Sequence, residues 1–133
     1  MDYRRTRVEA FMVRNNQLLM VRKPNEDGIA QWRLPAADLE EGEIPEDGVE
    51  RALVTETGMT GRVLDFLHRM KPKEGEYRMI LIHSCELRQE IGDMGYDPKD
   101  RQGGPAGYEV SWRSLRNPEL RETYQDVLRK AHL

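Results

Sequence analysis

The segment from Leu34 to Met59, LPAADLEEGEIPEDGVERALVTETGM, constrains the fold of this chain more than any other part of it. Pro45 suits the first position of a helix, and the two acidic residues after it place negative charge at the positive end of the helix dipole. Gly58 is the residue type that commonly ends a helix, because it adopts the left-handed conformation without strain. The segment therefore predicts a charged loop followed by a helix over residues 45–57.

The same segment resembles the signature of the Nudix family, the Nudix box. In that motif a Gly is followed after five residues by Glu and after seven more by Arg-Glu, an aliphatic residue, any residue, Glu-Glu, any residue, Gly and an aliphatic residue. The positions that agree are Glu43, Arg51, Leu53, Glu56, Gly58 and Met59. The resemblance implies that Glu43, Arg51 and Gly58 form the scaffold of the box, with Glu43 and Arg51 bracing the loop against the helix.

At three functional positions of the box, this sequence has a different residue from the family motif. The opening Gly is Ala37, the Glu after Arg is Ala52, and the first of the paired Glu is Thr55. Positions 52, 55 and 56 share one face of a helix, which is how the family presents carboxylates to divalent metal ions on a diphosphate. Only Glu56 remains there. A hard divalent cation prefers several oxygen ligands, so we expect metal-dependent hydrolysis to be weak or lost.

Four carboxylates are candidates for a site. Glu56 is the remaining metal ligand and catalytic residue implied by the resemblance, although a helical Glu often only faces solvent. Glu40 and Glu41 either join a rearranged metal site or are solvated charges in the loop. Glu109, in a short strand that resembles the family's late Glu-x-x-Trp element, either supplies a ligand or general base or pairs with a nearby Arg.

Cations also lie close to the box. Arg22, Lys23 and Arg33 lie where the strand and loop lead toward it, and such side chains bind phosphate through charge-assisted hydrogen bonds. The alternative is that they are solvated at the surface. Trp32 either stacks on a base or packs under the loop, which is more usual for a Trp ahead of a Leu-Pro turn.

Length and charge limit the remaining possibilities. The 133 residues suit one compact domain over residues 1–133. The net charge of −3, with signs mixed along the chain, gives no basic stripe for duplex nucleic acid. There is no apolar run long enough to span a membrane and no signal-peptide pattern. The single cysteine, Cys85, rules out an internal disulfide, so we expect a cytoplasmic protein. The sequence leaves a homodimer open.

Alternating and apolar runs predict the strands. The stretch from Thr6 to Val13 alternates, and Asn15-Asn16 makes a suitable turn into a second strand from Gln17 to Arg22. A second strand pair is predicted from Arg62 to Met70 and from Tyr77 to Leu87. The apolar run inside the last of these is typical of a strand that is buried on both faces.

The rest of the chain predicts a long loop, a strand and a helix. Residues 89–107 are polar and Gly-rich, which makes a long connection that is either mobile or functional, and the resemblance points to it as the region that sets substrate identity. Residues 108–112 read as a short strand, and Asn117-Pro118 starts a final amphipathic helix to about Lys130. The order of elements predicts an α/β fold with a mixed sheet, and the resemblance implies the Nudix α/β/α sandwich.

Two classes of function fit these patterns. The first, which the altered box favours, is a Nudix-type domain that binds a small nucleotide-type ligand, a nucleoside diphosphate linked to another group, and needs no cofactor. The second is an active Nudix hydrolase that cleaves such a compound with Mg²⁺ or Mn²⁺, using Glu56 together with Glu109 or a loop carboxylate. A third and weaker alternative is a structural or protein-interaction domain.

Overall fold

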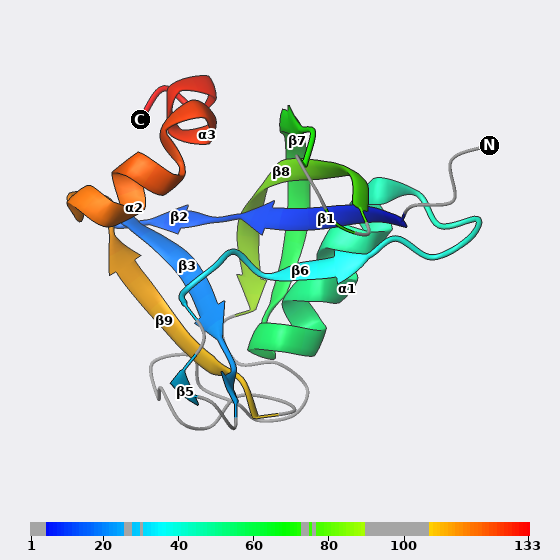
Figure 1. Cartoon of the computed structure of the whole chain (residues 1–133), viewed down its shortest axis with the longest axis horizontal. Coiled ribbons are helices and arrows are strands. Elements are labelled where there is room, and N and C mark those ends of the chain that lie inside the picture. The colour runs from blue at the N-terminus through cyan, green and yellow to red at the C-terminus, as the bar shows by residue number, and fades with distance from the viewer. Residues whose placement is uncertain (1–4, 26–27, 30, 73–74, 76, 90–106) are drawn as a thin grey trace.

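The computed structural model describes residues 5–25, 28–29, 31–72, 75, 77–89 and 107–133 (Figure 1). The strands are β1 (Arg5–Phe11), β2 (Val13–Arg14), β3 (Gln17–Arg22), β4 (Pro24–Asn25), β5 (Gly28–Ile29), β6 (Ala36–Asp38), β7 (Thr60–Met70), β8 (Tyr77–Gln89) and β9 (Glu109–Ser114). The helices are α1 (Pro45–Thr57), α2 (Pro118–Thr123) and α3 (Gln125–Lys130). Residues 90–106 of the predicted long loop lie outside the described part of the chain.

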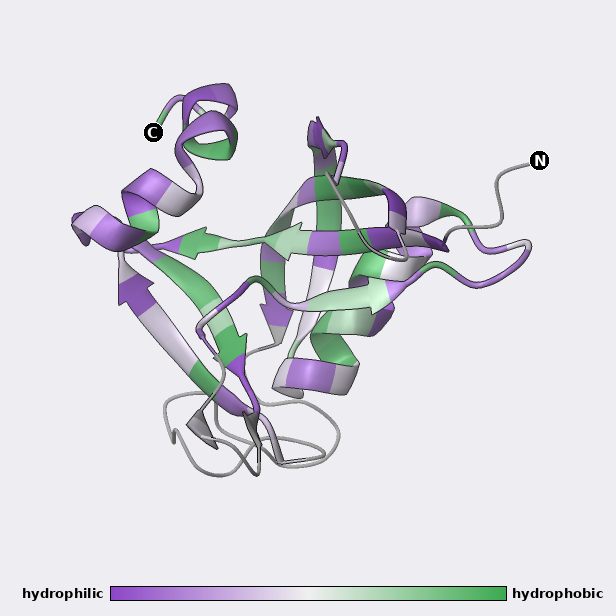
Figure 2. Cartoon of the chain, in the orientation of Figure 1, coloured by the Kyte–Doolittle hydropathy of each residue, from purple (hydrophilic) through white to green (hydrophobic). Residues whose placement is uncertain are grey.

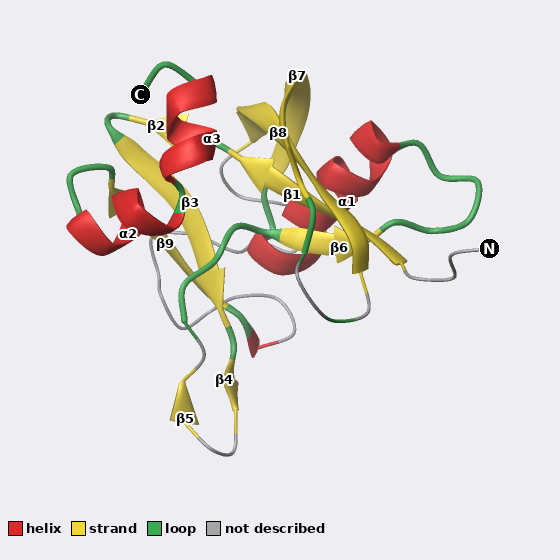
Figure 3. Ribbon diagram, turned by 45° about the horizontal axis from the view of Figure 1, so that its top comes forward, coloured by secondary structure: helices red, strands yellow, loops and turns green. Residues whose placement is uncertain are grey.

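The strands form a four-stranded sheet in the order β6-β1-β8-β7, a three-stranded sheet in the order β2-β3-β9, and a small pair of β4 with β5. In the first sheet β1 and β8 are parallel and the other neighbours are antiparallel. Helix α1 packs on β1, β6 and β7, whereas α3 packs on β7 (Figure 3). The predicted mixed α/β fold, with helices flanking the sheets, is confirmed.

Two hydrophobic clusters fill the space between these layers, and β1 contributes to both. Because successive side chains of a strand point to opposite faces, Val8 and Ala10 join the cluster under α1, while Phe11 joins the cluster under α2 and α3. Figure 2 shows the apolar residues along the strands and on the inner side of α1. The described helices include none that is long and apolar enough to cross a membrane.

Helix α1 has the bounds that the sequence predicts. It begins at Pro45 and carries acidic residues in its first turn. It ends at Gly58, whose φ of 75° is left-handed and whose N–H donates to the carbonyl of Val54. Val49 and Leu53 are fully buried, so the apolar stripe of the helix faces the core. The predicted helix over residues 45–57 is confirmed.

The predicted hairpin is present, but its first strand is shorter than expected. Asn15 and Asn16 have φ values of 51° and 61°, as a tight two-residue hairpin turn requires, and they join β2 to β3. The expected single strand over residues 6–13 is divided at Met12, whose carbonyl accepts a hydrogen bond from the N–H of Leu19. The chain therefore leaves the four-stranded sheet at this point and enters the other sheet.

The second predicted strand pair is confirmed, since β7 and β8 pair antiparallel. Strand β8 lies between β1 and β7, and its apolar run contacts both clusters through Leu81 on one face and Ile82 on the other.

The predicted final helix is two helices, because the chain leaves helical geometry at Tyr124. Asn117 caps α2 as expected, its side chain accepting a hydrogen bond from the N–H of Leu120 at 3.1 Å. The ring of Tyr124 packs against the second cluster. Burial of this side chain accounts for the break.

Candidate functional site

The loop before α1 is tied to the helix by one arginine. Arg51 donates to both carboxylate oxygens of Glu43, at 3.0 and 2.9 Å, and to the carbonyl of Asp38 at 2.8 Å. The backbone N–H of Glu40 also donates to Glu43. The hydrogen bonds from Arg51 and from this backbone N–H lower the pKa of Glu43. The result is a charged brace between loop and helix that holds the start of the box in place.

The helix face on which the resemblance places metal ligands carries one carboxylate in this protein. Ala52 is fully buried, Thr55 is exposed, and Glu56 is only 6% exposed. Arg33 donates to both oxygens of Glu56, at 2.8 and 2.9 Å, and the N–H of Ala36 donates to Oε1 at 2.9 Å. Three donors from the protein thus already satisfy the one carboxylate that remains on this face.

The contact with Glu56 raises the pKa of Arg33. Burial lowers the pKa of Arg33, but the hydrogen bonds and the charge of Glu56 outweigh burial and raise it. Arg33 also donates to the carbonyl of Leu34 at 2.9 Å. A bidentate guanidinium–carboxylate contact is among the strongest side-chain hydrogen bonds. Arg33 therefore supplies an internal cation to Glu56.

A second ion pair lies beside the first. On β1, Arg7 donates to Glu9 at 2.8 Å, and Glu9 is largely buried. The pKa of Glu9 is raised, chiefly by burial and also by the charge of Glu56. The charges of Arg7 and Arg33 act in the opposite direction and only partly offset this rise. We name these four residues, Arg7, Glu9, Arg33 and Glu56, the charge cluster. The sequence analysis did not select Arg7 or Glu9, although their alternation with buried apolar residues on β1 is a signal that they share one face.

The other predicted carboxylates pair elsewhere or face solvent. Glu109 lies opposite Arg22 in the β3–β9 ladder and accepts a hydrogen bond from it at 2.6 Å. Glu40 is 3.7 Å from Arg51 and its side chain is 68% exposed, and Glu41 is exposed. Of the predicted phosphate-binding cations, Arg33 and Arg22 are thus in ion pairs, whereas the Nζ of Lys23 lies 5.2 Å from the ring centre of Tyr108.

The donor set does not fit a divalent metal within the described residues. Among them, no group of three or more His, Cys, Asp or Glu residues is placed to hold a metal ion. Mg²⁺ and Mn²⁺ require several oxygen ligands, and the oxygens of Glu56 are already bonded to Arg33 and Ala36.

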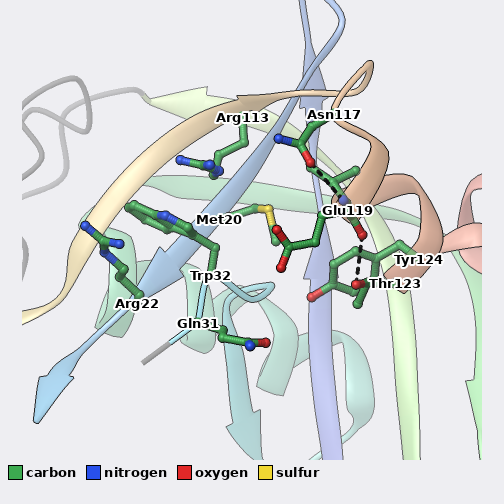
Figure 4. Close-up of a pocket in the computed structure, with 10 residues that line it drawn as sticks. Met20, Arg22, Gln31, Trp32, Arg113, Asn117, Glu119, Thr123 and Tyr124 are labelled. Atoms are coloured by element: carbon green, nitrogen blue, oxygen red, sulfur yellow. Dashed lines mark hydrogen bonds between the residues drawn. The ribbon is translucent and has the colours of Figure 1, made fainter. Parts of the chain in front are cut away.

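A pocket of about 280 Å³ lies beside the charge cluster, between β3, β9 and α2 (Figure 4). Its apolar lining is formed by Met20, Trp32, Leu120 and Tyr124. Its polar lining is formed by Arg22, Gln31, Arg113, Asn117, Glu119 and Thr123. No motif in the sequence indicates this pocket, because the strands and the helix that line it are brought together only by the fold.

Trp32 forms one wall of the pocket, and two arginine side chains lie over its indole ring. The guanidinium carbons of Arg22 and Arg113 lie 4.4 and 4.9 Å from ring centres of its indole. Tyr124 lines the same pocket, and its pKa is raised to about 12 by burial and then by the charge of Glu9. Tyr124 therefore lines the pocket and lies close enough to the charge cluster for the charge of Glu9 to raise its pKa.

Comparison with solved structures finds the same fold in several proteins. A NUDIX hydrolase from Nitrosomonas europaea is 17% identical, with a TM-score of 0.65 over 97% of this chain and 88% of that chain. A UDP-X diphosphatase is 18% identical, with a TM-score of 0.66 over 100% of this chain and 66% of that chain. The E. coli ORF135 protein is 20% identical, with a TM-score of 0.60 over 92% of this chain and 79% of that chain.

Comparison with curated proteins finds no match. The model of the NUDIX domain, however, matches residues 3–124, which is nearly the whole chain. This match includes the box, both sheets, α1 and α2. The chain belongs to the Nudix domain family.

Proposed function

We propose that this Nudix domain binds a small nucleotide-type ligand, a nucleoside diphosphate linked to another group, and hydrolyses it weakly or not at all. The observation that carries this proposal is the contact of Arg33 with both oxygens of Glu56. It engages the one carboxylate that remains on the face where the family presents its metal ligands.

The expected loss of hydrolysis follows from the energetics of that contact. A metal ion could reach Glu56 only by displacing Arg33 from a largely buried ion pair, and breaking such a pair typically costs about 3 kcal/mol or more. Ala52 and Thr55 offer no carboxylate in compensation. Since each ~1.4 kcal/mol of lost transition-state stabilisation is a tenfold loss of rate, turnover several powers of ten below that of a complete box is expected.

Ligand binding is supported by the surroundings of the box. The charge cluster brings two guanidinium groups together, and the adjoining pocket provides an aromatic wall with polar side chains around it. A pocket with an apolar lining and a few polar groups is the usual form of a small-molecule site. The nucleotide class is supported by the similar fold of a protein whose name, UDP-X diphosphatase, states a nucleotide substrate.

The alternative is an active hydrolase. It is favoured by the intact brace of Glu43 with Arg51, which keeps the loop of the box in place. An active site would require Glu56 to exchange Arg33 for a metal ion and to gain further oxygen ligands.

Binding and product formation, measured on the same samples, test the proposal. The full chain would be titrated by calorimetry with nucleoside diphosphates, ADP-ribose and other nucleotide sugars, and each mixture assayed for cleavage with Mg²⁺ or Mn²⁺. Nucleoside triphosphates and dinucleoside polyphosphates complete the panel. We expect binding without appreciable cleavage.

Glu56→Gln is the informative variant, and Glu122→Gln, an exposed change on α2, is its matched control. Metal-dependent cleavage that is lost in Glu56→Gln and kept in Glu122→Gln would contradict the proposal and establish the hydrolase. An absence of both binding and cleavage across the panel would contradict ligand binding. Circular dichroism would first show that Glu56→Gln is folded.

A further inference from the structure

We propose that the charge cluster binds a diphosphate through its guanidinium groups and without a divalent metal ion, so that Mg²⁺ weakens binding instead of supporting it. This inference rests on the proposed function and adds how the charge of the ligand is neutralised. It is carried by the arrangement of the cluster, in which the arginines are more exposed than the glutamates.

In both ion pairs of the charge cluster the cation is closer to solvent than the anion. The side chain of Arg33 is 33% exposed and that of Glu56 is 7% exposed. The side chains of Arg7 and Glu9 are 21% and 12% exposed. A ligand that approaches from solvent therefore meets the guanidinium groups before the carboxylates, although the formal charges of the four residues cancel.

The arginines keep hydrogen-bond donors for a ligand. A guanidinium carries five N–H donors. Arg33 uses three of them, two on Nη1 and one on Nη2, toward Glu56 and the carbonyl of Leu34. Arg7 donates its Nε–H to Glu9, and among the described residues its two terminal nitrogens donate to no carboxylate. These N–H groups suit phosphate oxygens, which guanidinium groups bind through charge-assisted hydrogen bonds.

The two guanidinium groups lie near one point. Burial raises the pKa of Glu9, and the charges of Arg7 and Arg33 both oppose this rise, so both cations are close to the same carboxylate. Like charges that are held close together repel each other. An anion bound between the two guanidinium groups relieves that repulsion, which favours a compact anion with several oxygens.

Lys23 extends the cationic surface. Its Nζ and the guanidinium carbon of Arg33 lie 5.2 and 5.6 Å from the ring centre of Tyr108, so both cations lie against the same aromatic ring. Lys23 is exposed, and it forms no salt bridge within the described part of the chain. Together with the charge cluster, Lys23 therefore gives this surface an excess of positive charge.

A divalent metal ion acts against a site of this kind. Among the described residues no group of three or more His, Cys, Asp or Glu side chains is placed to hold one, so Mg²⁺ meets the diphosphate in solution. The Mg²⁺ complex carries less negative charge than the free diphosphate, and some of its oxygens are already coordinated to the metal. It should therefore bind the guanidinium groups more weakly than the free anion does.

The test is calorimetric titration of the full chain with ADP, GDP, CDP, UDP and inorganic pyrophosphate, first in EDTA and then in excess Mg²⁺. We expect binding in EDTA, and an affinity that falls at least about threefold in Mg²⁺. The pyrophosphate titration separates two sources of the anion. Tighter binding of a nucleotide than of pyrophosphate identifies a nucleotide as the ligand, whereas equal binding of all five identifies the free anion; either result supports the site.

Two variants test the cations, Arg7→Met and Lys23→Met. Each should lower the affinity for the anion in EDTA about tenfold, as expected for the loss of a charge-assisted contact. Arg116→Met, an exposed change after β9, is the matched control and should leave the affinity unaltered. Arg33 is kept, because its removal would also leave Glu56 buried without a partner. Lys23 is exposed, so Lys23→Met keeps the test valid if circular dichroism shows that Arg7→Met is unfolded.

The outcomes separate the inference from the proposed function. Nucleotide binding that requires Mg²⁺, or metal-free binding that is unchanged in both Arg7→Met and Lys23→Met, would overturn metal-independent binding of the diphosphate and leave nucleotide binding intact. An absence of binding for all five compounds, with and without Mg²⁺, would overturn both.

Discussion

Arg33 holds both carboxylate oxygens of Glu56, at 2.8 and 2.9 Å, on the face of α1 where the family presents metal ligands. The contact joins the segment before β6 to the helix, and the N–H of Ala36 adds a third hydrogen bond. A guanidinium thereby takes the electrostatic role of a divalent cation toward this carboxylate. The same contact that ties the loop to the helix occupies both oxygens of the carboxylate.

Replacing Arg33 by Met should destabilise the fold markedly. The change leaves the carboxylate of Glu56 buried without its partner, and an unpaired buried charge costs about 3 kcal/mol. The free energy of unfolding, measured by urea denaturation at pH 7, should fall by about that amount. The double variant Arg33→Met with Glu56→Met should recover part of the loss, because no charge is then left unpaired.

Arg113→Met is the matched control, since Arg113 also stacks on an aromatic ring but, within the described residues, holds no carboxylate. This variant should lower the free energy of unfolding by less than about 1 kcal/mol. Equal destabilisation by Arg33→Met and Arg113→Met would show that the ion pair contributes nothing beyond packing.

Removing the internal cation while adding one carboxylate should create metal affinity. In the variant Arg33→Met with Thr55→Glu, the exposed position 55 gains a ligand and Glu56 is released from Arg33. Millimolar Mn²⁺ should raise the melting temperature of this variant, because a ligand that binds only the folded state stabilises it. The wild type, and the control Arg33→Met with Thr55→Gln, should show no such rise. An equal rise in the wild type would contradict the role given to Arg33.

Helix α1 is predictable because its signals are local. Pro45 and Gly58 mark its ends within the sequence that forms it, and its apolar positions repeat at the helical period. The contact of Glu43 with Arg51 spans eight residues inside the same motif.

The charge cluster is not predictable in this way. Arg33 and Glu56 are separated by 23 residues, and the side chains meet only after the loop has folded against the helix. The sequence identified Arg33 as a cation close to the box, but it held no information on which carboxylate it would face. The division of the last helix is similar, since it depends on where Tyr124 packs.

Loss of the brace in the loop should have a smaller effect than loss of Arg33. Glu43→Gln removes the charge that Arg51 holds with two hydrogen bonds, and we expect the free energy of unfolding to fall by about 1 kcal/mol at pH 7. Because the pKa of Glu43 is lowered in the fold, its contribution is present above the ordinary Glu pKa of about 4.3 and is lost as the pH falls through the lowered value.

Glu40→Gln is the control for this brace, because Glu40 is mostly exposed and 3.7 Å from the same arginine. Glu40→Gln should lower the free energy of unfolding by no more than about 0.5 kcal/mol. A larger loss in Glu40→Gln than in Glu43→Gln would show that Glu43 is not the principal partner of Arg51.

His83 should make stability depend on pH between about 5 and 7. The side chain is 3% exposed, its Nε2 lies 3.5 Å from Glu46, and its Nδ1 has no hydrogen-bond partner among the described residues. Burial lowers the pKa of His83, although Glu46 partly opposes this. As the pH falls through about 6.5, the unfolded chain takes up a proton that the folded chain resists, so stability is lost.

The measurement is the free energy of unfolding from urea titrations at several pH values from 7 to 5, in the wild type and in His83→Gln. The glutamine does not titrate, so the variant should lose less stability across this range, even if its stability at pH 7 is lower. His68→Gln changes a less buried histidine on β7 and is measured in parallel as the control. If His83→Gln retained the full slope of the wild type, the buried position of His83 would not govern the pH dependence.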